Sequence, residues 1–192
     1  MAFLRIYLLM GLLAHKVVWE FLKRASTVAT TASAARPPQS VFLRLVKAVK
    51  IGILLGIIVQ TLSPEILPIT ADPFALRAWG VVVFTAGLLI AILSRIHLGN
   101  NWSDIETGQV LKRQTVVSKG IYAYVRHPIY LGDILLLLGL ELCLNSWLVL
   151  AAALLAPIVF WKAVQEEKML VNDLPGYSVY CAQTKRFIPF IV

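Results

Sequence analysis

The chain has 192 residues, of which 59% are hydrophobic and 15% charged, and its formal net charge is +8 at pH 7. Soluble domains are about 45–50% apolar, so this composition argues against a soluble protein and predicts one domain embedded in a membrane. The basic excess is typical of the positive-inside rule. No stripe of lysine and arginine interleaved with aromatic residues occurs, which argues against nucleic-acid binding. The cysteines and histidines have no metal-ligand spacing, so we predict no metal site.

The first apolar segment, residues 3–21, is the weakest predicted span because Arg5, His15 and Lys16 interrupt it. A helix that crosses a bilayer needs about 20 mostly apolar residues. A cleaved targeting peptide is the alternative, since the small residues that follow resemble a signal-peptidase site. The charged residues before that site favour the span. In either case the small residues at 27–40 indicate a flexible linker. Residues 1–40 are therefore expected to form a weak span plus a linker.

Two clearer spans follow at residues 42–62 and 76–98, and together they make up a middle region of residues 41–98. The first of them contains Gly52 and Gly56 in a G-x-x-x-G pattern, which lets two helices approach closely. We interpret this pattern as packing inside the monomer rather than as a contact between two copies.

The last two spans, residues 128–144 and 147–164, are separated only by Asn145 and Ser146. A link this short predicts an antiparallel helical hairpin. Pro128 suits the first turn of a helix, where its missing N–H leaves no hydrogen bond unmade.

Basic residues indicate how the five predicted spans are oriented. They concentrate in the first and third connections and after the fifth span, whereas residues 63–75 and the Asn145-Ser146 link carry none. The positive-inside rule then places the basic segments and the C-terminus in the cytoplasm and the N-terminus outside. The predicted fold is all-α: a polytopic membrane protein with about five transmembrane helices, a C-terminal helical hairpin and a cytoplasmic tail. The membrane would be a bacterial inner membrane or the endoplasmic reticulum.

Most of the polar residues that could carry chemistry lie in residues 118–133, at the mouth of the fourth span. Helical spacing puts Arg126, Tyr130 and Asp133 on one stripe. Asp133 lies about 9 Å deeper than His127 at 1.5 Å per residue. A carboxylate at that depth should face protein or a water-filled cavity. The alternative is a structural pair of Arg126 and Asp133 bridged by Tyr130.

A second polar group ends the fifth predicted span. Lys162 precedes Glu166 by four residues, so both share one face of the helix, and Glu167 follows directly. A solvent-exposed helix end with one Lys–Glu pair would explain these residues as well. The tail that follows has Gly176-Tyr177 and Tyr180 at set intervals, and this pattern favours a functional role for the two glutamates.

These segments together resemble the isoprenylcysteine carboxyl methyltransferase family, which belongs with the membrane phospholipid methyltransferases. The resemblance starts at Leu98, where Leu-Gly-x-x-Trp-Ser is similar to the bacterial members, and it runs to about residue 190. We therefore expect residues 99–192 to form a methyltransferase-like catalytic region. The resemblance is carried by residues 114–122, residues 126–132, Glu166-Glu167-x-x-Leu170, Gly176-Tyr177-x-x-Tyr180 and Arg186-x-x-Pro189.

The resemblance implies an integral-membrane enzyme that uses S-adenosylmethionine. Residue by residue, it implies backbone contacts to the cofactor from Gln114, Thr115, Val116 and Val117. It also implies a wrap around the cofactor by Tyr122, His127, Pro128, Ile129 and Tyr130, and a hydrogen bond accepted by Glu166. The tail after the fifth span would complete this cofactor-binding site.

Lys162, Asp133 and Arg126 are the catalytic candidates, Lys162 from the resemblance and the other two from their place at the mouth of the fourth span. Lys162 stands where eukaryotic members have an arginine that contacts the substrate carboxylate. Lysine keeps the positive charge but lacks the planar guanidinium, which can donate two parallel hydrogen bonds to a carboxylate. Asp133 replaces an apolar residue common in the family.

The chemistry of methyl transfer suits this residue set. Aligning the nucleophile with the methyl carbon can supply roughly 7–11 kcal/mol. An ionised carboxylate needs no base, whereas an amine needs one, for which Asp133, Glu166 and Glu167 are candidates. We expect a lipid-soluble acceptor that enters from the bilayer, in contact with membrane lipids, first of all a carboxylate such as that of a prenylcysteine. A phospholipid amine or another lipid-soluble molecule is the alternative, and the oligomeric state cannot be read from the sequence.

Two other classes of protein are also considered. Arg126-His127-Pro128-x-Tyr130-Leu131-Gly132-Asp133 also resembles NADPH-dependent sterol reductases, although Ile129 and the Glu166-Glu167 pair argue against them. A non-enzymatic, lipid-binding membrane protein fits the composition and topology equally well, and only the polar cluster argues against it.

Overall fold

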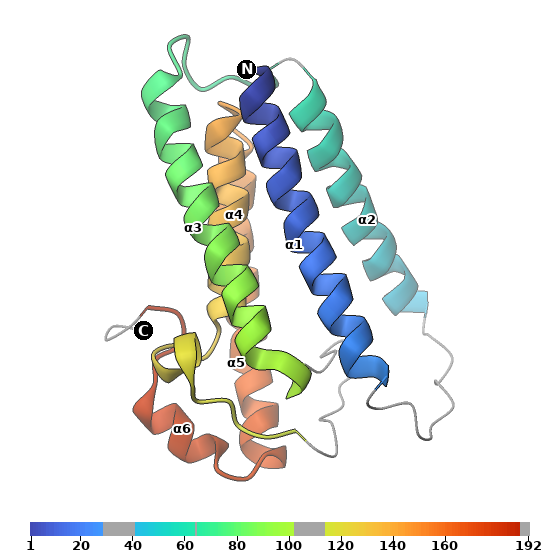
Figure 1. Ribbon diagram of the computed structural model, residues 1–192, viewed down its shortest axis with the longest axis vertical. Coiled ribbons are helices and arrows are strands. Elements are labelled where there is room, and N and C mark those ends of the chain that lie inside the picture. Colours follow the sequence, from blue (N-terminus) through green and yellow to red (C-terminus); the bar gives the residue numbers. More distant parts are fainter. Residues whose placement is uncertain (29–40, 64, 102–113, 189–192) are drawn as a thin grey trace.

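The computed structural model describes residues 1–28, 41–63, 65–101 and 114–188, and within these ranges it is all-α, without strands (Figure 1). The linker expected at residues 27–40 lies almost wholly outside the described residues. The described residues form five long helices and three short ones. They are α1 (Ala2–Val28), α2 (Val41–Leu62), α3 (Phe74–Leu98), η1 (Gly99–Asn101), η3 (Gly120–Ala123), α4 (Pro128–Cys143), α5 (Val149–Asp173) and α6 (Tyr177–Gln183).

Three of the described helices are long and apolar enough to cross a membrane: Ala2–Arg24, Phe74–Leu98 and Val149–Asp173. The N-terminal segment, the weakest of the sequence predictions, is one of them. In α2 the apolar part Ile51–Leu62 is shorter, and α4 has 16 residues. The all-α membrane class is therefore confirmed, while the number of five spans stays a prediction.

Successive long helices run in opposite directions, so the N-terminus and the α2–α3 connection lie at one end of the bundle. The C-terminal segments and α6 lie at the other end (Figure 1). α5 runs to Asp173, not to about residue 164 as its apolar run suggested. Glu166 and Glu167 consequently lie inside a helix, about two turns before its end, and the helix holds them in a fixed orientation.

The tightest packing in the bundle joins α3 to α4 and depends on glycine. A Cβ atom on Gly87 would lie 2.3 Å from the backbone nitrogen of Leu136, and one on Gly139 would lie 2.2 Å from that of Phe84. The two backbones therefore approach more closely than any side chain would permit. Phe84 and Leu136 belong to the adjoining apolar core. This contact fixes α4, and with it the polar residues at its start, against α3.

The G-x-x-x-G pattern of α2 does not pack against another helix of the described chain. A Cβ atom on Gly52 or Gly56 would meet nothing within 4 Å, so the expected close packing inside the monomer is wrong. The described side chains of α2 are mostly exposed. Polar contacts near its C-terminal end hold it instead, since Gln60 donates a 2.7 Å hydrogen bond to Glu141 of α4.

The end of the bundle that carries α6 is closed by the C-terminal tail. Backbone hydrogen bonds join Arg126 N–H to the Lys185 carbonyl (2.8 Å) and His127 N–H to the Arg186 carbonyl (3.0 Å). The Tyr180 hydroxyl donates to the Tyr122 carbonyl at 2.7 Å. The tail is therefore fastened to the segment that leads into α4. Pro189, the last residue of the sequence resemblance, lies outside the described residues.

Candidate active site

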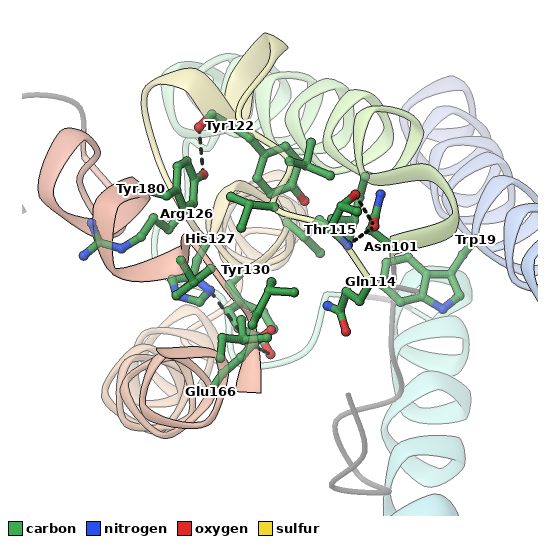
Figure 2. Close-up of a pocket in the computed structure, with 17 residues that line it drawn as sticks. Trp19, Asn101, Gln114, Thr115, Tyr122, Arg126, His127, Tyr130, Glu166 and Tyr180 are labelled. Carbon is green, nitrogen blue, oxygen red and sulfur yellow. Dashed lines mark hydrogen bonds and ion pairs between the residues drawn. The ribbon is translucent and has the colours of Figure 1, made fainter. Parts of the chain in front are cut away.

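A pocket lies where the tail, the start of α4 and the last turns of α5 meet (Figure 2). Most of the sequence-predicted residues line it. They are Gln114, Thr115, Val116, Val117, Tyr122, Arg126, His127, Ile129, Tyr130 and Glu166.

Three predicted residues do not line the pocket. Pro128 is fully buried beneath its wall as the first residue of α4. Lys162 lies one turn before Glu166 and places its ammonium 5.7 Å from the centre of the Tyr130 ring. Asp133 lies one turn further into the bundle, where its carboxylate is 3.2 Å from His15 Nε2.

One wall of the pocket joins α4 to α5 through Glu166 (Figure 2). Tyr130 donates a 2.9 Å hydrogen bond to Glu166 Oε2, and His127 Nδ1 lies 3.8 Å from the same oxygen. The His127 and Tyr130 rings are stacked, with centroids 5.5 Å apart and planes 11° from parallel. A carboxylate thus faces the pocket with aromatic groups beside it.

Glu167, which points away from the pocket, holds this wall in place. Its Oε1 accepts hydrogen bonds from Arg126 Nε (2.8 Å) and lies 3.0 Å from His127 Nε2. Its Oε2 accepts a 2.9 Å hydrogen bond from Arg186. With 8% of its side chain exposed, Glu167 is a buried anion with three cationic or polar partners. We expected it only as a possible base, and this positioning role was missed.

Arg126 contacts Glu167 and the tail rather than Asp133. One terminal nitrogen donates to the Cys181 carbonyl at 2.9 Å and also to the Thr184 carbonyl. The structural pair of Arg126 and Asp133 considered from the sequence is therefore wrong, because each residue has a different partner.

The opposite wall is formed by the extended segment that starts at Gln114. Asn101, at the end of η1, accepts hydrogen bonds from the Thr115 N–H (2.8 Å) and hydroxyl (3.0 Å). Asn101 and Thr115 lie across the pocket from Glu166 in Figure 2. Asn101 thus anchors the segment beside the pocket, while the backbone contacts of residues 114–117 to a cofactor stay a prediction.

Tyrosines from the tail and from η3 close the remaining side. Burial raises the pKa of Tyr180 to about 12 and raises the pKa values of Tyr122 and Tyr177 further. These phenols therefore stay neutral at physiological pH and can act as hydrogen-bond donors and as apolar surfaces.

Sequence reasoning missed the pocket residues that lie outside the matched motifs or were given no role in them. The most distant of them is Trp19 of α1, whose ring lies 5.3 Å from the guanidinium carbon of the fully buried Arg95. The sequence signal that could have indicated Trp19 is its position in the charged half of the weak first span. The others are Leu98, Asn101, Leu170, Leu174, Tyr177 and Tyr180.

The chain is similar to several known proteins. A "Protein-S-isoprenylcysteine O-methyltransferase" of Schizosaccharomyces pombe is 32% identical over 50% of this chain and 42% of its own length. The "Cobalt-zinc-cadmium resistance protein CzcN" of Cupriavidus metallidurans is 34% identical over 56% of this chain and 50% of its own. The chain thus spans about half the length of the curated relatives it matches.

A solved structure has the same fold. It is titled as the eukaryotic intramembrane Ras methyltransferase ICMT, and it matches with a TM-score of 0.55 and 22% identity over 81% of this chain and 55% of that one. The model of the family "Phospholipid methyltransferase" matches residues 76–174, which hold α3, the α4 wall with His127 and the α5 wall with Glu166. The chain is therefore a member of the phospholipid methyltransferase family, and the pocket lies largely within the part that defines it.

Proposed function

We propose that this protein is an integral-membrane methyltransferase that uses S-adenosylmethionine to methylate a lipid-like acceptor. The observation that carries the proposal is the pocket in which Glu166, Tyr130 and His127 face the Gln114–Val117 wall, in a chain of this family. S-adenosylmethionine would supply an electrophilic methyl group on a sulfonium. The protein would have to hold and align the reactants, and alignment alone can supply roughly 7–11 kcal/mol.

The pocket residues suit such a donor by their chemistry. Glu166 offers a carboxylate to the donor's hydroxyl or ammonium groups, and a charge-assisted hydrogen bond of this kind is stronger than a neutral one. The faces of Tyr122 and Tyr177 can lie against the adenine ring and attract the sulfonium cation. Backbone groups of residues 114–117 would provide the remaining polar contacts.

We further propose that the pocket faces the cytoplasm and that α1 to α5 all cross the membrane. The alternation of the helices supports this topology (Figure 1), because it puts the basic residues at the end of α1, beside η3 and after α5 at the pocket end. A water-soluble donor would then enter from the cytoplasm and a lipid-like acceptor from the bilayer.

A carboxylate is the first candidate for the acceptor, as the names of the isoprenylcysteine O-methyltransferase relatives suggest. Lys162, over the outer face of Tyr130, is the cation placed to attract it. An amine is the second candidate, favoured by the family description and by Asp133 beneath Ile129 and Tyr130. An ionised carboxylate needs no base, whereas a protonated amine must first lose a proton.

The proposal is tested with purified protein in lipid nanodiscs. Calorimetry should show binding of S-adenosylmethionine and not of NADPH, and radiolabelled donor should transfer label to membrane lipids or added lipophilic acceptors. Base-labile label would identify an ester, and stable label an amine. Binding of NADPH alone would favour a reductase, and binding of neither would favour a non-enzymatic protein; both results would contradict the proposal.

A further inference from the structure

A contact between His15 of α1 and Asp133 of α4 lies one helical turn below the donor pocket, and neither residue lines that pocket. His15 Nε2 and Asp133 Oδ1 are 3.2 Å apart. Both atoms are covered, and neither has a hydrogen-bond partner among the described residues. The pair joins the N-terminal helix to the helix that carries His127 and Tyr130.

The position of the pair follows from helical spacing. Asp133 follows Ile129 by four residues and Tyr130 by three, so it shares their face one turn deeper in the bundle. On α1, His15 precedes Trp19 by four residues, and the two rings lie 6.1 Å apart. Ile129, Tyr130 and Trp19 all line the pocket, so the pair lies directly beneath its floor.

The exposure of the two side chains is unusual for such a depth. The side chain of Asp133 is 40% exposed and that of His15 is 23% exposed. Since Oδ1 is covered, the exposed surface belongs to the rest of the Asp133 side chain. Ionisable groups inside a membrane are costly and mark a ligand or proton path more often than a structural contact.

We propose that His15 and Asp133 are specificity-determining residues for the methyl acceptor. The two side chains receive the head group of the acceptor beneath the donor. They favour a head group that can give up a proton and disfavour an anionic head group. This inference rests on the proposed methyl transfer and bears on the choice between its two acceptor classes. Asp133 attracts a cationic or protic head group, whereas its negative charge repels a carboxylate.

The proton balance assigns each residue a task. The acceptor's nitrogen or oxygen forms a bond to the methyl carbon, and the carbon–sulfur bond of the sulfonium donor breaks, leaving its electron pair on a neutral thioether. The proton of the acceptor passes to the Asp133 carboxylate, whose covered oxygen lies 3.2 Å from His15 Nε2. A positioned general base of this kind typically contributes about 10²–10⁴-fold to a rate.

The experiment compares three acceptors on one common alkyl chain: an amine, an alcohol and a carboxylic acid. Label transfer from S-adenosylmethionine gives the ratio of the protic to the carboxylate rate for each variant. In Asp133→Asn this ratio should fall about 100-fold, and in His15→Gln it should fall in the same direction. Asp133→Glu, which keeps the charge, should restore much of it, and Asp173→Asn on exposed α5 surface is the matched control.

Each result has a definite meaning. A selective fall in the ratio, with donor affinity retained, supports the inference. An unchanged ratio, or equal losses on all three acceptors, overturns it and assigns the pair to structure. A wild-type protein that methylates only the carboxylate, or that binds donor but methylates none of the three, also overturns it while donor binding stands. Absence of donor binding would remove the proposed function as well.

Discussion

His127 Nδ1 and Glu166 Oε2 lie 3.8 Å apart across the contact between α4 and α5, on the wall of one pocket. Sequence separates these residues by almost forty positions, and the Tyr130 hydroxyl bridges to the same carboxylate oxygen at 2.9 Å. This relationship makes the two glutamates of α5 separable by experiment, because Glu166 faces the pocket and Glu167 faces the tail.

Substitution of the pocket-facing groups should remove donor binding. Glu166→Gln loses a charge-assisted hydrogen bond, which is worth about 1.5–3 kcal/mol, so the affinity for S-adenosylmethionine should fall about 10- to 100-fold. His127→Ala should reduce it at least as much, with membrane insertion intact. Calorimetry in nanodiscs measures both. Wild-type affinity in either variant would contradict the placement of the donor.

Glu167 should matter for stability more than its neighbour. Glu167→Gln leaves Arg126, whose side chain is 8% exposed, without its anionic partner, and breaking a buried pair costs about 3–5 kcal/mol. The thermal unfolding temperature in detergent should drop clearly. Glu20→Gln, which removes an exposed pair with Arg24, is the control and should change little. Equal temperatures for the two variants would show that Glu167 is not a structural anchor.

The α3–α4 contact should tolerate no added methyl group. Gly139→Ala forces a Cβ atom against the Phe84 backbone, 2.2 Å away without rearrangement, so the two helices must separate and the protein should lose stability. Overpacking of this kind typically costs about 1–3 kcal/mol. Gly52→Ala is the matched control, because its Cβ atom meets nothing within 4 Å. Detergent unfolding curves should therefore shift for Gly139→Ala alone.

Lys162→Ala should weaken the binding of the acceptor without weakening the binding of the donor. If the ammonium attracts an anionic acceptor, the KM for a lipophilic carboxylate rises several-fold while the affinity for S-adenosylmethionine stays near the wild-type value. Lys168→Ala, an exposed lysine further along α5, is the control. Steady-state kinetics at saturating donor test this, and an unchanged acceptor KM would count against the role.

The fold of the tail should lose stability at alkaline pH. Burial raises the pKa of Tyr180 to about 12 from its ordinary value of 10.0. The unfolded chain therefore gives up this proton first as the pH rises, and stability present below pH 10 is lost between about pH 10 and pH 12. Tyr180→Phe should make this loss shallower, whereas Tyr124→Phe, at a residue 60% exposed, should not. Unfolding temperatures across this pH range provide the measurement.

Much of this site could be predicted from the sequence because its residues come in compact motifs. The Arg126-His127-Pro128 turn lies at the start of one helix, and helical periodicity puts Glu166 on the same face of the next helix as Lys162, four residues earlier. The α4–α5 hairpin follows from a two-residue link. These are local relationships, and local relationships can be read from spacing.

The parts that could not be predicted depend on contacts between distant segments. Trp19 reaches the pocket only because α1 packs against α3 and α4, and no periodicity in α1 reveals that. The outward orientation of Gly52 was missed because a G-x-x-x-G pattern permits close packing without requiring it. The extension of α5 past its apolar run was missed because hydropathy marks the bilayer, whereas a helix can continue beyond it.

The walls of the pocket are contributed by widely separated stretches of polypeptide, from Trp19 near one terminus to Tyr177 and Tyr180 near the other. A nascent chain that has just emerged as far as α5 therefore lacks the last side of its binding chamber. The pocket is therefore complete only once α6 has docked against the segment that leads into α4.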